Sequence, residues 1–407
     1  MTIRDLSLFE GSARLQMTES IELTIQSLQA YGHEHDHWVI AWSGGKDSTA
    51  TLTLIVWLIT SGKIKGPKRL TVLYADTRME LPPLAIAASE IMDELADRDI
   101  EFRAVRAPLD KRFLVYMLGR GVPPPNNNTL RWCTRQIKVD PMAAAIAESL
   151  GDGTALTITG VRQGESAIRD RRIEMSCGKD GAECGQGWYQ QVLPESKGVR
   201  GRIATLAPLL HWRVCHVWEW LRNWAPKEEF GGWPTEIIAD AYGGDEAEEL
   251  NARTGCIACP LAQEEKALES IIALPRWGHL TPLRDLKPIY RWLREPAQRL
   301  RKSGVERLKD GSIGKNPQRM GPLTLEARLK ALEDILSIQK RINAADGRLT
   351  LNLIDEEEES RIRELIAAET WPNGWDGDEP HADQFLPVIF YENGAEQHDL
   401  FGLEETV

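Results

Sequence analysis

The sequence has few cysteines and no long apolar run. Only six cysteines occur in 407 residues, and no stretch of about 18 consecutive apolar residues is present, so a membrane-spanning helix is not expected. The first residues are polar and lack the apolar core of a secretory signal peptide. We therefore expect a cytoplasmic protein whose cysteines serve as metal ligands or redox groups rather than as disulfides.

Positive charge is also in short supply. The chain carries 49 Lys and Arg against 61 Asp and Glu, a formal net charge of −12. An anionic substrate would therefore need a local basic patch. One such stretch is 284–319, with eleven basic and four acidic residues. Together with Arg169, Arg171 and Arg172, it could meet nucleic-acid phosphates, or it could form a partner surface or solvated helices.

Apolar segments with strand character alternate with helical patterns in the first half of the chain. This alternation is typical of an α/β fold with a doubly wound parallel sheet covered by helices on both faces. Strands are expected at 37–42, 69–77, 100–108 and 155–162, and helices at 48–62, 82–98 and 139–151.

The pattern changes after residue 162. The segment 163–205 reads as an ordered loop, 214–225 as a Trp-rich helix and 324–343 as a periodic helix, and the acidic run DEEEES as the solvated start of a helix. The sequence predicts four parts: an N-terminal helix within 1–36, an α/β domain over 37–225, a helical extension with a Cys pair and basic residues over 226–345, and an acidic tail over 346–407.

A glycine-rich loop joins the first expected strand to the helix that follows. Its residues are Ser43, Gly44, Gly45, Lys46, Asp47 and Ser48. The N-terminus of a helix offers backbone N–H groups and the positive end of a dipole, which suit a phosphate. Glycine lets the backbone approach the anion closely. The Walker and GxGxxG patterns are both absent, so the loop predicts a phosphate site of another kind.

This SGGKDS loop resembles the signature of the PP-loop ATP pyrophosphatases, which hold the pyrophosphate end of ATP and adenylate their substrates. The resemblance implies ATP and Mg²⁺ as ligands and catalytic roles for Lys46 and Asp47. The stretch YADTRMELP (74–82) is similar to the second-strand region of that family, which implies that Asp76 lies near the nucleotide or its metal. Asp76 could instead cap the next helix.

A second motif, GVRQGESAIR, follows the fourth expected strand at the sheet edge where open α/β folds bind ligands. It is similar to the GVR-x-x-ES-x-x-R motif of PAPS-reductase-like PP-loop proteins. The resemblance implies nucleotide contacts from Gly160, Arg162, Glu165 and Arg169, with a catalytic role for Arg162, whose guanidinium can hold a phosphate. The alternative is a surface arginine paired with a glutamate.

Three cysteines have a spacing typical of a metal site in a cytoplasmic protein. Cys133 lies in RWCTRQ, and Cys256 and Cys259 form a CxxC pair. Thiolates suit zinc or an iron–sulfur cluster, although the pair could also be buried small residues.

The segment CTRQIKVDPM resembles that of the sulfonucleotide reductases, where two adjacent cysteines and a later CxxC hold a [4Fe–4S] cluster. Here Thr134 stands at the second position. The resemblance implies a cluster, with zinc as the alternative, held by Cys133, Cys256, Cys259 and a fourth cysteine. Cys184 is favoured over Cys177 and Cys215 as the fourth ligand.

Two later segments narrow the resemblance. Residues 206–221 are similar to a segment of the PAPS-reductase-like family. Residues 319–336 are similar to the GP-x-T-LEAR segment of the C subunit of the Dnd DNA phosphorothioation system and of its Ssp counterpart. This implies an enzyme of phage defence that forms AMP and pyrophosphate from ATP and adenylates a DNA backbone phosphate for sulfur incorporation. DNA, a cysteine desulfurase and other phosphorothioation proteins are the implied partners.

Three other functions stay open. A sulfonucleotide (PAPS or APS) reductase would need a nucleophilic cysteine near the C-terminus, and the last cysteine of this chain is Cys259. A tRNA thiolation enzyme would use the same loop and cysteine pairs. A non-catalytic ATP-binding defence component would keep the loop without turnover.

Overall fold

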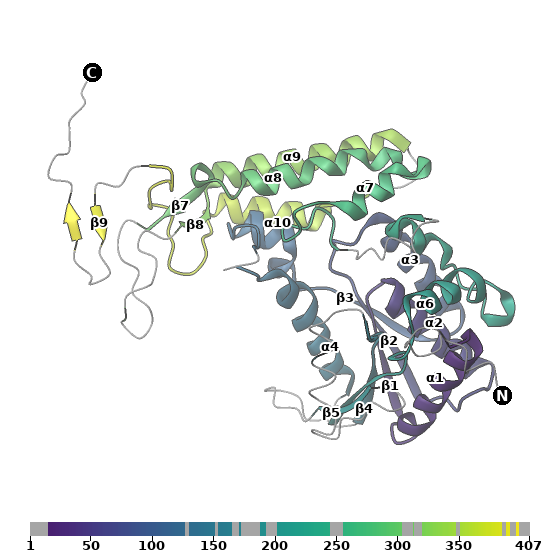
Figure 1. The fold of residues 1–407 in the computed structure, drawn as a ribbon. Helices are drawn as coiled ribbons and strands as arrows, with labels where there is room; N and C mark the ends of the chain where they lie inside the picture. Colours follow the sequence, from purple (N-terminus) through teal and green to yellow (C-terminus); the bar gives the residue numbers. More distant parts are fainter. Residues whose placement is uncertain are drawn as a thin grey trace, which may run out of the picture. The chain divides into compact units, whose positions relative to one another are not determined.

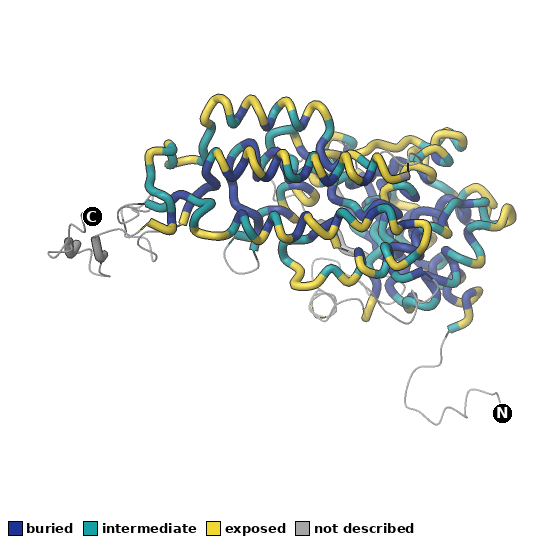
Figure 2. The backbone as a smooth tube through the Cα atoms, turned by 90° about the horizontal axis from the view of Figure 1, so that it is seen from above, coloured by how far each residue is buried: buried dark blue, intermediate teal, exposed yellow. Residues whose placement is uncertain are grey.

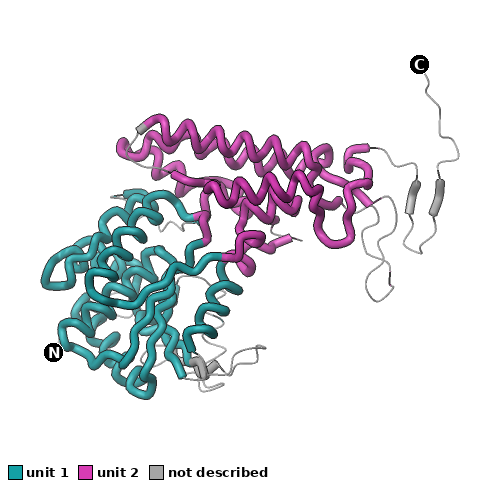
Figure 3. Tube along the Cα trace, turned by 180° about the vertical axis from the view of Figure 1, so that it is seen from behind, with its two compact units in different colours: residues 1–76, 80–106, 138–255 teal, residues 77–79, 107–137, 256–407 magenta. Residues whose placement is uncertain are grey.

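The computed structural model describes residues 15–126, 130–150, 154–164, 171, 188–192, 202–244, 255–302, 312, 320–346, 351–384, 388–390 and 396–398. The chain forms two compact units (Figure 3). Unit 1 comprises Met1–Asp76, Glu80–Arg106 and Lys138–Gly255, and unit 2 comprises Thr77–Met79, Ala107–Ile137 and Cys256–Val407. Within the described residues, no helix is both long enough and apolar enough to span a bilayer.

Unit 1 is built on a six-stranded sheet with the order β3-β2-β1-β4-β6-β5 (Figure 1). All strands are parallel except β5, which pairs antiparallel with β6 at the edge. The predicted α/β fold is therefore confirmed. The strands are β1 His37–Trp42, β2 Arg69–Ala75, β3 Glu101–Val105, β4 Thr154–Ile158, β5 Trp188–Val192 and β6 Arg202–Ala207.

The prediction of a loop over 163–205 is wrong in part, because β5 and the start of β6 fall within it. The strands are short and lie among glycine-rich and arginine-rich segments. The alternation of apolar and polar residues in these strands covers too few positions to stand out from the surrounding loop-like sequence.

Helices cover both faces of the sheet. On one face, α4 packs through Ala145 and Leu150 against Val39 of β1 and Leu73 of β2. On the other face, Trp42 of β1 donates its indole N–H to Thr49 of α2 over 2.9 Å. The helices of unit 1 are α1 Met17–Gly32, α2 Lys46–Thr60, α3 Pro82–Asp97, α4 Asp140–Leu150 and α6 Val214–Glu219.

Unit 2 is mainly helical, and buried and exposed residues alternate along α9 and α10 (Figure 2). Its described elements include α7 Lys266–Ala273, α8 Leu286–Trp292, α9 Leu325–Asp346, α10 Glu356–Ala367, the π-helical turn η3 Val115–Gly119, and the antiparallel strands β7 Arg299–Arg301 and β8 Met320–Leu323. The helices predicted over 324–343 and after the acidic run are both present.

Arg328, the arginine of the GP-x-T-LEAR segment, stabilises unit 2. Its side chain is fully buried and donates to the carbonyl oxygens of Leu118 at 2.9 Å, Gly119 at 2.6 Å and Thr370 at 3.0 Å. Burial lowers the pKa of this guanidinium to about 10, so it stays charged at neutral pH. Since the last carbonyls of a helical turn lack partners within the turn, Arg328 caps the end of η3.

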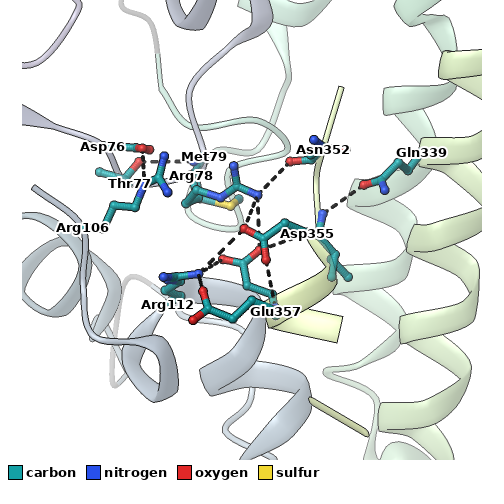
Figure 4. A network of polar contacts seen from close by, with 12 residues as sticks. Asp76, Thr77, Arg78, Met79, Arg106, Arg112, Gln339, Asn352, Asp355 and Glu357 are labelled. Carbon is teal, nitrogen blue, oxygen red and sulfur yellow. Dashed lines mark hydrogen bonds and ion pairs between the residues drawn. The ribbon is translucent and has the colours of Figure 1, made fainter. Parts of the chain in front are cut away.

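The acidic run also does more than begin a solvated helix. Asp355 is the N-cap of α10 and accepts from the N–H of Glu358 at 2.9 Å. Glu358 is 2 % exposed and pairs with Arg78 at 3.4 Å and with Arg112 at 3.5 Å. Glu357 adds a contact of 2.9 Å to Arg112 (Figure 4), so the run ties three segments of unit 2 together.

Candidate nucleotide-binding site

The SGGKDS loop lies where the strand order of unit 1 reverses. The chain passes from β1 to β2 and β3 on one side, and β4 pairs with β1 on the other. In open α/β sheets, ligands bind outside the carboxyl ends of the strands at this switch point. The loop follows β1 and the GVR motif follows β4, so the two motifs meet there.

The loop is shaped by one glycine and two serines. Gly44 has a φ of 71°, a left-handed conformation that favours glycine. The Ser48 hydroxyl accepts from the N–H of Ser43 at 3.2 Å and donates to the carbonyl of Gly45 at 3.0 Å. These bonds fold the loop back on the first turn of α2, whose N-cap is Gly45.

Three charged side chains form a buried cluster at the start of α2. Lys46 and Arg162 are 8 % and 4 % exposed. The Lys46 Nζ lies 3.3 Å from a carboxylate oxygen of Asp47, and the other oxygen accepts from Arg162 Nε at 2.5 Å. Two cations share one anion, so the cluster keeps one excess positive charge. Beside a helix N-terminus, that excess favours a phosphate.

Gly160 explains how the two motifs can be so close. A Cβ at this position would lie 2.8 Å from the backbone C and O of Asp47 and 2.8 Å from the backbone N of Ser48. Real Cβ atoms do not approach backbone atoms that closely, so only glycine fits. The contact brings Arg162, two residues on, to Asp47, and Arg162 also donates to the carbonyl of Trp212 at 3.3 Å.

Tyr242 is a site residue that the sequence analysis missed. It lies at the end of the short 3₁₀ segment η7 (Glu236–Tyr242). The backbone N–H of Lys46 donates to its hydroxyl at 3.2 Å, and the Lys46 Nζ lies 4.6 Å from its ring centroid. The two residues are 196 positions apart, and no local pattern could have linked them.

Asp76 lies at the carboxyl end of β2, next to β1 in the sheet. It is paired with Arg106 through a contact of 2.5 Å, and its backbone N–H donates to the carbonyl of Val105. It does not cap the next helix, because the N-cap of α3 is Leu81. A role beside the nucleotide or its metal stays a prediction.

The three predicted metal ligands of the described chain all belong to unit 2. Burial raises the pKa of the Cys133 thiol, and the nearby Cys259 raises it further. The N–H of Cys259 donates to the carbonyl of Cys256 at 3.2 Å. The buried Tyr290 faces both cysteines of the pair, whose charges add to the burial that raises the pKa of its hydroxyl.

The thiols fit zinc or an iron–sulfur cluster in donor type, and Cys133 lies near Cys259. Across the described part of the chain, however, no three His, Cys, Asp or Glu side chains are grouped closely enough to hold a metal ion. Cys215 lies on α6 in unit 1. The remaining predicted residues, Glu165, Arg169, Cys177 and Cys184, lie outside the described residues.

The fold and the loop define an α/β domain with a candidate phosphate site at the switch point of the sheet. Residues 37–225 match the model of the phosphoadenosine phosphosulfate (PAPS) reductase domain, so this part of the chain is similar to that domain. Among solved structures, the chain is similar to a PAPS reductase from Candida auris in complex with phosphate, with 14 % identity, coverage of 52 % of this chain and 88 % of that one, and a TM-score of 0.31. No curated protein matches the sequence.

Proposed function

We propose that the protein is an ATP pyrophosphatase that adenylates a backbone phosphate of DNA and so prepares it for sulfur incorporation. The observation that carries the proposal is the buried cluster of Lys46, Asp47 and Arg162 at the N-terminus of α2, at the switch point of the sheet. This arrangement suits the terminal phosphates of ATP.

The chemistry is an attack on the α-phosphorus of ATP. A non-bridging oxygen of the acceptor phosphate forms the new P–O bond, and the bond between the α-phosphorus and the bridging oxygen breaks. Pyrophosphate leaves with the electron pair. The loop N–H groups and Lys46 stabilise the charge that develops on it, and Arg162 holds the phosphate or orients Asp47.

Mg²⁺ would neutralise part of the charge of the ATP phosphates, and Asp76 is the acidic side chain proposed nearest to it. A thiolate-bound [4Fe–4S] cluster or zinc ion is proposed at Cys133, Cys256 and Cys259 with Cys184 as the fourth ligand. Such a centre would carry sulfur or shape the site. A cysteine desulfurase is the proposed sulfur source.

The test is pyrophosphate release from ATP, measured under anaerobic conditions with and without DNA. Lys46→Ala should abolish release. The matched control is Lys68→Ala, because Lys68 also belongs to unit 1 but forms an exposed ion pair with Asp36 at 2.8 Å. Stimulation by DNA, but not by tRNA, would support the proposed acceptor. If no condition yields pyrophosphate although ATP binds, a non-catalytic nucleotide-binding role replaces this proposal.

A second candidate is a sulfonucleotide reductase-like enzyme, which the match of residues 37–225 to the PAPS reductase domain favours. It predicts sulfite release from PAPS or APS in the presence of a dithiol reductant. Since Cys259 is the last cysteine, the nucleophile would have to come from within the chain rather than from its C-terminal segment. Sulfite without pyrophosphate would select this candidate.

A further inference from the structure

Unit 2 contains a pocket of ≈ 390 Å³ next to the CxxC pair. Its wall includes Pro260, the residue after Cys259, and three basic side chains from α8 and the turn after it: Lys287, Arg291 and Arg294. No residue that lines it is acidic. Pockets of this size hold small ligands or parts of larger ones.

The basic side chains differ in how far their charge is balanced. Lys287 is 8 % exposed and pairs with Glu265, which lies outside the lining, at 2.5 Å. Arg291 is exposed, and among the described residues its side chain donates only to the carbonyl of Gln263, at 3.2 Å. In the described part of unit 2, no carboxylate forms an ion pair with Arg291 or Arg294.

Arg294 shapes the pocket. It donates to the carbonyl of Pro125 and, at 2.9 Å, to that of Pro260. Its Nε is buried and has no hydrogen-bond partner among the described residues. The guanidinium therefore lies in a place where a further negative charge would be favourable.

The donors of the pocket point to one ligand chemistry. Two guanidinium groups without carboxylate partners, a buried lysine and the amides of Asn126 and Gln263 line it. The Tyr290 hydroxyl also belongs to the lining and can donate a hydrogen bond. Arginine side chains match phosphate oxygens with paired N–H groups.

We infer that this pocket binds a phosphate group, and that the phosphate belongs to a DNA strand. The inference deepens the proposed function, on which it rests for the identity of the strand. It also accounts for an acidic chain that binds an anionic polymer, because the positive charge is concentrated in one pocket. The remaining basic side chains of the 284–319 stretch do not have to contact DNA.

The experiment measures binding of a short labelled DNA duplex by fluorescence anisotropy at several salt concentrations, with the full chain. Arg291→Gln should weaken binding about tenfold and reduce the slope of log K against log salt by about one. Arg291→Lys keeps the charge and should keep the slope. The matched control is Arg284→Gln, because Arg284 is an exposed arginine outside the pocket, paired with Glu269 at 2.9 Å.

An equal loss in Arg284→Gln, or no loss in Arg291→Gln, overturns the inference. If AMP or inorganic phosphate binds in a way that depends on Arg291 while DNA does not bind, the pocket is a phosphate site for a free nucleotide and the assignment to DNA is wrong. Lys46→Ala separates the two proposals, since it should abolish pyrophosphate release and leave DNA binding intact. If pyrophosphate is released and DNA binding does not depend on Arg291, the inference about the pocket is refuted while the proposed function stands.

Discussion

Gly160→Ala offers the sharpest test of the candidate site, because the close approach of β4 to α2 depends on the absence of a side chain. The added Cβ would lie 2.8 Å from three backbone atoms of Asp47 and Ser48. None of these is the end of a flexible side chain that could turn away. Either the first turn of α2 or the segment after β4 has to move.

The size of that movement follows from the distance. Ordinary contact between non-bonded atoms needs about 3.5 Å, so the two segments must separate by roughly 0.7 Å. Overpacking of this kind costs about 1–3 kcal/mol of folding free energy. Because Arg162 and Asp47 lie on the segments that separate, their 2.5 Å contact should break. Displacements of about 1 Å in a catalytic site lower rates by up to ~100-fold.

The assays are urea unfolding and pyrophosphate release from ATP. We expect a lower unfolding midpoint and release reduced by about 10- to 100-fold. Gly278→Ala is the matched control, since no heavy atom lies within 4 Å of a Cβ at that position; both its stability and its turnover should match those of the wild type. A Gly160→Ala protein with wild-type stability and turnover would refute the reasoning.

Three further substitutions test the site and unit 2. Tyr242→Phe removes the hydroxyl that accepts from the backbone N–H of Lys46, which leaves this N–H free to donate to a phosphate. A non-hydrolysable ATP analogue should therefore bind about 3- to 10-fold tighter, as measured by calorimetry. Weaker binding would show instead that the hydroxyl helps to hold the nucleotide. Arg328→Lys replaces the planar guanidinium, whose three nitrogens reach three carbonyls, with a single ammonium that cannot reach all three. It should lower the free energy of unfolding in urea by about 3 kcal/mol, while the exposed Arg341→Lys should change little. Glu358→Gln removes the buried charge between two arginines and should cost about 3 kcal/mol in the same assay; an unchanged midpoint would contradict the ion-pair network.

The residues that the sequence placed correctly are those whose signal is local. SGGKDS lies between an apolar strand and a helical pattern along the chain, so its position at the end of β1 could be predicted. For Gly160 and Asp47, the sequence could predict that both follow neighbouring parallel strands. It could not predict that the two residues are in close contact. Tyr242 could not be predicted, since its contact with Lys46 joins positions far apart in the chain and depends on tertiary packing.

Local motifs can also mislead about role. The segment GPLTLEAR resembles a family signature, and in the structure its arginine, Arg328, is fully buried and caps η3. A guanidinium with its donors committed to three carbonyls is not available to a DNA phosphate. The acidic run after residue 354 gives a second example, because Glu358 is buried between Arg78 and Arg112 instead of lying in solvent. Charge read from sequence therefore says little until its partners are known.

The charge balance at the loop bears on turnover as well as on binding. Pyrophosphate concentrates its charge on two phosphate groups, and a loop with two uncompensated cations and a helix N-terminus would hold it tightly. Asp47 offsets one of the two buried cations, so the excess is a single charge. In the proposed reaction, Asp47 would leave enough positive charge at the loop to bind ATP while allowing pyrophosphate to leave.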